Sequence, residues 1–246
     1  MCLWSVYMFN NFARLLAFTI STLAATATSA ATVELDKQSG SVFGTNGWTA
    51  VLISLGADPV VSPTWVAAGA FALKGDIDSK PGVELFDAFC LDIATWLRLP
   101  SLYSVTGSPF ASDPLTSLQM SSIAKLFNTA YKGLDLSNAT QSAGFQLALW
   151  EIVNEAAGNG YALGSGNFSA AGSAAATNYA DSLLAGLAGR ETQKYRLTFL
   201  QSTDPRAKDG HYSQNLVTVS PVPLPAAGLM LMAGLGGLGL MRRRRA

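Results

Sequence analysis

Apolar and polar positions follow two different periods along the chain. In the first half, short alternating or apolar runs are separated by turn residues, which is typical of strands. These runs predict strands at 33–43, 48–55, 65–74 and 83–93. A loop holding Pro100, Pro109 and Pro114 follows them, and a helical period begins beyond it.

The second half of the chain predicts three helices and two closing strands. The first helix, at 116–131, has an apolar side made of Leu118, Ile123, Leu126, Phe127 and Ala130. The second begins with Asn138 or Thr140 as its N-cap and runs to about residue 157, where Gly158-Asn159-Gly160 ends it. An Ala-rich third helix at 169–187 and strands at 195–201 and 215–219 complete the pattern. We therefore expect an α+β fold, an antiparallel β-sandwich or barrel with an inserted helical section at 116–187.

Residues 1–30 have the pattern of a secretory signal peptide. Arg14 precedes an apolar run at 15–25, and small residues follow at Ala25, Ala27 and Ala30. This is the order of charged region, apolar region and cleavage site that export signals share. The globular domain is then expected at 31–220.

Residues 221–246 have the pattern of a second targeting signal. Residues 226–241 carry no charge, and Arg242, Arg243, Arg244 and Arg245 follow at once. A helix of 16 residues would be about 24 Å long, which is marginal for a hydrocarbon core of about 30 Å. Because an arginine cluster resists translocation, this segment should stop as a transmembrane helix in the inner membrane.

Together with Pro223, Leu224 and Pro225, this segment resembles the PEP-CTERM sorting signal in its VPLPA variant. The resemblance covers about the last 25 residues, with motif, apolar run and basic stop in the family's order. It implies a Gram-negative envelope protein that an exosortase processes near 222–226. The expected destination is the cell surface or the extracellular matrix, and the alternative is a plain C-terminal membrane anchor.

Charge and composition add one exclusion. Arg14 and the four terminal arginines account for five of the 16 Lys and Arg, so the part between them has 11 against 16 Asp and Glu. A mildly acidic domain without a basic stripe is a poor binder of nucleic acid. We therefore expect no nucleic-acid partner.

Two residues of the expected domain are candidates for a chemical role. Cys2 falls in the signal peptide, so Cys90 is the one cysteine of the exported part, and it comes late in a predicted strand. A lone cysteine in an oxidising compartment is unusual. Gln146 falls on the same helix stripe as Leu149, Trp150 and Val153, which directs its amide into the core. An unpartnered buried amide costs about 1–3 kcal/mol, so Gln146 should be hydrogen-bonded or chemically changed.

The segments around these two residues, about 83–154, resemble the bacterial thioester domain of surface adhesins. The matching motifs are an aromatic-Cys-apolar strand, Phe89-Cys90-Leu91, and an apolar-Gln-x-x-apolar-Trp helix, Phe145 to Trp150. The resemblance implies that Cys90 supplies a thiol and Gln146 an acyl group, which condense to a thioester with loss of ammonia. Phe89, Leu91, Phe145, Leu149 and Trp150 would form the apolar shell around that bond. The Thr-Gln pair sometimes seen in thioester domains has no secure counterpart, because Thr140-Gln141 comes too early in the helix.

The expectation is an exported surface or matrix protein that bonds covalently to amines of a protein or polymer partner and is not an enzyme. The alternative is a non-covalent matrix protein of the same fold with an unlinked Cys90. A Cys90/His211 catalytic pair is not expected, since Cys90 lacks the basic surroundings that lower a thiol pKa. The acidic pairs Asp76/Asp78 and Asp87/Asp92 lack the ligand number of a calcium loop, and we expect neither metal nor cofactor.

Overall fold

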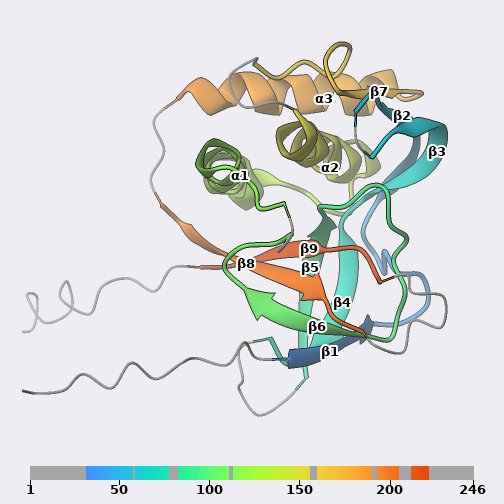
Figure 1. The fold of residues 1–246 in the computed structure, drawn as a ribbon, viewed down its shortest axis with the longest axis vertical. Helices are drawn as coiled ribbons and strands as arrows, with labels where there is room; N and C mark the ends of the chain where they lie inside the picture. Colours follow the sequence, from blue (N-terminus) through green and yellow to red (C-terminus); the bar gives the residue numbers. More distant parts are fainter. Residues whose placement is uncertain are drawn as a thin grey trace, which may run out of the picture.

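Six antiparallel strands close into a barrel, and a second, smaller sheet and three helices lie beside it (Figure 1). The computed structural model describes residues 32–57, 59–77, 83–110, 113–155, 160–189, 193–204 and 212–221. The barrel order is β1-β4-β5-β9-β8-β6, and the smaller sheet has the order β3-β2-β7. This confirms the predicted α+β class, a barrel with an inserted helical section.

The barrel strands come from both halves of the sequence. The chain enters with β1 and closes the barrel with β8 and β9, which pair with β6 and β5 respectively. Their bounds are Thr32–Lys37 (β1), Phe71–Gly75 (β4), Glu84–Cys90 (β5), Ser101–Thr106 (β6), Tyr195–Ser202 (β8) and Leu216–Pro221 (β9). Side chains such as Leu35, Tyr103 and Leu200 fill the interior.

The predicted strand at 65–74 is in fact two strands that belong to different sheets. β3 (Val61–Gly69) pairs with β2 (Trp48–Leu55), whereas β4 pairs with β1 and β5. The break falls at Ala70, whose N–H donates to the hydroxyl of Ser142 (2.9 Å). Because a helix side chain takes this N–H, the chain can pass from one sheet to the other.

The three helices start where polar caps satisfy their free N–H groups. α1 (Ser117–Ala130) begins with a capping box between Thr116 and Gln119, and α3 (Ala174–Ala185) with Ser173. α2 (Ala139–Asn154) has Asn138 as its N-cap, whose side-chain oxygen accepts from the N–H groups of Thr140 and Gln141. Of the predicted apolar side of α1, Ile123, Leu126 and Phe127 are buried and Ala130 is partly buried, but Leu118 at the start of the helix is exposed.

α2 is the central helix of the helical section. It lies between α1, α3 and the small sheet, above β5 of the barrel (Figure 1). Every side chain from Ser142 to Ile152 is buried, so the helix has no solvent face. Gly144 permits the close approach to α3, since a Cβ there would lie 2.8 Å from the ring of Tyr179.

Several predicted boundaries were wrong. The first strand was expected to run to residue 43, but β1 ends at Lys37 and a turn follows. α3 was expected from residue 169, but Phe168–Ala171 forms strand β7, and Gly172, at φ +89°, turns the chain before the helix. α2 ends at Asn154 rather than near residue 157. β6 lies inside the proline-containing stretch that was expected to be a loop, because it pairs with β1 and β8 on both sides.

Candidate functional site

Cys90 is the last residue of β5, at the end of the barrel that faces α2. It pairs with Leu216 of β9, and the next residue, Leu91, donates its N–H to Asn215 O (2.9 Å). The side chain is 2% exposed. The strand thus fixes the sulfur at the boundary between barrel and helices.

Gln146 lies in the middle of α2 with its amide against the peptide groups of Cys90. Its Oε1 accepts from the N–H of Cys90 (2.9 Å), and its Nε2 donates to the carbonyl oxygen of Cys90 (2.8 Å). The side chain is 1% exposed. The structure therefore brings together the two residues that the sequence singled out, 56 positions apart.

The environment of the sulfur keeps it protonated. Burial raises the pKa of the Cys90 thiol well above its ordinary range, the indole N–H of Trp150 lowers it, and the charge of Asp92 raises it. The thiol donates to the carbonyl oxygen of Asp92 (3.2 Å). The indole N–H faces the sulfur without full hydrogen-bond geometry and has no other partner. It is therefore free to interact with negative charge on the sulfur.

The predicted shell residues are all buried around this pair. The rings of Phe89 and Phe145 are tilted against each other with centroids 4.7 Å apart, and the edge-to-face contacts of Phe127 with the two rings have centroid distances of 5.7 and 4.9 Å. Leu91, Leu149 and Trp150 are at most 4% exposed. Phe127 and Tyr131, which also contacts Phe89, were not assigned to the shell. The helical period did place Phe127 on the inward side of α1, which was the available signal.

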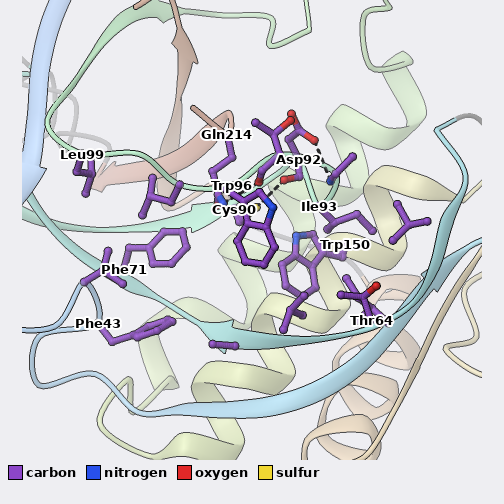
Figure 2. Close-up of a pocket in the computed structure, with 18 of the residues that line it drawn as sticks. Phe43, Thr64, Phe71, Cys90, Asp92, Ile93, Trp96, Leu99, Trp150 and Gln214 are labelled. Carbon is purple, nitrogen blue, oxygen red and sulfur yellow. Dashed lines mark hydrogen bonds between the residues drawn. The ribbon is translucent and has the colours of Figure 1, made fainter. Parts of the chain in front are cut away.

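A cavity of about 800 Å³ opens beside Cys90 and Trp150 (Figure 2). The small sheet and β4 supply one wall, and the segment 91–99 after β5 supplies the other. Figure 2 shows the indoles of Trp96 and Trp150 close to Cys90, with Phe43 and Phe71 farther along the cavity. The sequence did not predict this cavity, because its walls meet only through the sheet topology.

Gln214 contributes a fixed polar atom to the same cavity. Its Nε2 donates to Thr95 O (3.0 Å), and its Oε1 is buried without a partner. Tyr103, which donates to Ser213 Oγ (2.8 Å) and Gln214 O (3.2 Å), holds the backbone of this segment. The cavity thus contains an acceptor whose orientation is set by a hydrogen bond on its other side.

Other candidate chemistry finds little support in the described residues. They contain no group of three or more His, Cys, Asp and Glu side chains placed to hold a metal. Asp87 accepts from Asn46 (2.7 Å) and Asp92 from the N–H of Ala94 (3.1 Å), so both carboxylates have local roles. His211 and Asp78 lie outside the described residues.

Both predicted targeting segments lie outside the described residues as well. This applies to the signal peptide at 1–30 and to Pro223, Leu224, Pro225 and Arg242 to Arg245. In the ranges that are described, no helix has the length and apolar character needed to cross a membrane.

No model of a protein family matches the chain, and no curated protein matches it.

Proposed function

We propose that this protein is exported to the surface or extracellular matrix of a Gram-negative bacterium and attaches there covalently, through a thioester between Cys90 and Gln146, to an amine of a partner. The observation that carries the proposal is the pair of hydrogen bonds between the Gln146 amide and Cys90 at a buried strand–helix junction. These contacts hold the Gln146 amide against the peptide groups of Cys90, the residue that carries the thiol, and such proximity is the main requirement for an intramolecular condensation.

The condensation needs no cofactor. The Cys90 sulfur adds to Cδ of Gln146, the C–N bond breaks, and the thiol proton leaves with the nitrogen as ammonia. The hydrogen bond from Nε2 to the Cys90 carbonyl oxygen fixes the side from which the ammonia departs. Phe89, Phe127 and Phe145 surround the junction and keep out the water that would hydrolyse the product.

A partner's amine would then open the thioester. An amine attacks the carbonyl carbon of the thioester, a C–N bond forms, the C–S bond breaks, and the amine's proton passes to the sulfur. The product is an amide at Gln146 and a free Cys90 thiol. Trp150 would assist this step, since its indole N–H faces the sulfur on which negative charge develops.

Attachment to a surface agrees with the targeting signals of the sequence. The signal peptide would deliver the chain across the inner membrane, and the apolar segment at 226–241 with its arginines would hold it there transiently. An exosortase would then process the chain near Pro223-Leu224-Pro225. The partner would be a surface or matrix protein or polymer.

A second function is also supported by a specific observation. In the described structure the Gln146 amide has both its oxygen and its nitrogen paired, so it is stable as an ordinary buried amide. The protein would then be a non-covalent structural or matrix-associated protein with an unlinked Cys90.

Amine uptake distinguishes the two functions. The exported protein is incubated with methylamine under native conditions and digested, and the peptide that contains Gln146 is analysed by mass spectrometry. The covalent function predicts methylamine on Gln146 together with a newly titratable thiol, and no uptake by Cys90→Ala. An unmodified Gln146 in the untreated and treated protein would favour the non-covalent function.

A further inference from the structure

The cavity beside Cys90 has the dimensions of a ligand site. Its volume of about 800 Å³ falls within the range of about 300–1,000 Å³ that small-molecule sites occupy. Such a cavity is much larger than methylamine or the unbranched stem of a lysine side chain would need. Aromatic rings line it at both ends, with Trp96 and Trp150 near the sulfur and Phe43 and Phe71 farther away (Figure 2).

Two carbonyl oxygens of the cavity wall lack donors once the thioester has formed. Gln214 Oε1 has no partner already, and its side chain is 7% exposed. The carbonyl oxygen of Asp92 accepts from the Cys90 thiol, and condensation removes that proton. The reactive state therefore leaves two acceptors on residues that line the cavity without donors, and N–H or O–H groups of a ligand would satisfy them.

The remaining polar groups of the wall also favour a cation. Asp92 carries the one carboxylate among the described lining residues, and its charge acts on the Cys90 sulfur. Lys37, the one cationic side chain among them, is exposed. The indole of Trp96, which is 70% exposed, offers a π face of the kind that attracts ammonium groups.

We propose that this cavity binds an amine carried on a bulky aromatic or branched apolar group, with the nitrogen held by Gln214 Oε1 and Asp92 O and the apolar group between the aromatic walls. The covalent step and the freeing of Asp92 O rest on the proposed thioester, whereas the unpartnered Gln214 Oε1 and the aromatic walls do not. The nitrogen lies beside Cys90, so once the bound ammonium has lost one proton to the Asp92 carboxylate or to solvent, its lone pair is next to the carbonyl carbon that it attacks. The site thus selects arylalkyl amines over small amines and over uncharged molecules of the same shape.

Binding without reaction can be measured in Cys90→Ala, which cannot form the thioester and leaves Asp92 O without its thiol donor. The probes are 2-phenylethylammonium, 2-phenylethanol as its uncharged counterpart, and methylammonium, titrated by calorimetry into the purified exported protein. We expect saturable binding of one 2-phenylethylammonium, at least about tenfold tighter than either other probe. Gln214→Leu and Trp96→Ala, each combined with Cys90→Ala, should weaken binding by about tenfold.

Trp65→Ala in the same background is the matched control, because Trp65 is similarly exposed but does not line the cavity. Its binding should be unchanged. Circular dichroism identifies any variant that fails to fold. If Cys90→Ala does not fold, Cys90→Val provides the test with the same three probes, because valine fills the space of the thiol and has no donor for Asp92 O.

Equal affinity for the ammonium and the alcohol, or the absence of saturable binding, would overturn the inference. The intact mass of the unaltered protein separates this from a failure of the proposed function. A protein that lacks one ammonia while its Cys90→Ala variant binds no amine would retain the thioester and lose the binding site. A protein of full mass whose variant binds the ammonium selectively would retain the site and lose the covalent step.

Discussion

Gln146 holds Cys90 by the peptide groups on either side of its Cα, not by the sulfur: its Oε1 and Nε2 bond the N–H and the carbonyl oxygen of the same residue. The amide therefore stays in place as long as the thiol is unlinked, whether or not the thiol is protonated. This separates a structural role of Gln146, the connection of α2 to β5, from its proposed role as acyl donor.

The structural role of Gln146 predicts that replacing it destabilises the fold even in a protein that cannot form the thioester. In a Cys90→Ala background, Gln146→Leu leaves the peptide N–H and carbonyl of residue 90 unpartnered in the core. We expect the free energy of unfolding to fall by about 1–3 kcal/mol in urea titrations. Gln141→Leu, in the same helix but half-buried, should cost less. Equal losses for the two variants would contradict this role.

Trp150 should affect the rate of amine uptake through its N–H. Trp150→Phe keeps an aromatic ring against Phe168 but removes the donor that faces the sulfur. We expect the rate constant for methylamine uptake to fall roughly tenfold, a change of about 1.4 kcal/mol in the barrier. Trp48→Phe is the control, since Trp48 does not line the cavity, and its rate should match the unaltered protein. An unchanged rate in Trp150→Phe would show that the sulfur leaves without help from the indole.

The raised pKa of the Cys90 thiol predicts a pH dependence that the thioester abolishes. Burial favours the protonated thiol in the folded state, so this contribution to stability is complete below the ordinary thiol pKa, near about 8.5, and is lost as pH rises further. The unlinked variant Gln146→Ala should therefore lose stability between about pH 8.5 and 10, below the range in which Tyr103 and Tyr131 titrate. Urea titrations across this range should show no such loss in Gln146→Ala combined with Cys90→Ala, which has no thiol.

Glu151 predicts a second pH dependence, at lower pH. Burial raises its pKa to about 7, the N–H of Ala162 lowers it, and the charges of Glu155 and Asp181 raise it. A carboxyl with a raised pKa stabilises the fold when protonated, so this contribution is present below the ordinary pKa of about 4.3 and is lost as pH rises through about 7.

Glu151→Gln should remove that dependence, because the amide oxygen can still accept from Ala162 and carries no charge. We expect the difference in unfolding free energy between pH 5 and pH 8 to be smaller in Glu151→Gln than in the unaltered protein. A difference as large as before would assign the pH dependence to other groups.

The sequence predicted the elements of the fold better than their connections. Period and caps located α1 and α2 closely, because Thr116 and Asn138 satisfy N–H groups within their own helices. The division of 65–74 into β3 and β4 could not be predicted, since it depends on a hydrogen bond from Ala70 to Ser142, a residue 72 positions away.

The candidate site, too, could be predicted only in part. Cys90 and Gln146 could be singled out because a lone cysteine and a polar residue on an apolar stripe are local signals. Their cavity could not be predicted, because Phe43, Trp96 and Gln214 come from three distant segments that meet only in the folded chain. Residues that act through such encounters, including the unpartnered oxygen of Gln214, leave no pattern in the sequence.

The central claim is tested most directly by the mass of the tryptic peptides that contain Cys90 and Gln146. Trypsin should release residues 75–98 and 133–190 from the exported protein, since no cleavable bond lies within either peptide. If the thioester forms, freshly isolated protein digested without amines yields these two peptides joined, at their summed mass less one ammonia, and no titratable thiol. Two separate peptides, with Gln146 as an intact amide and Cys90 as a free thiol, would contradict the claim; a separate peptide with glutamate at position 146 would record a thioester that had been hydrolysed.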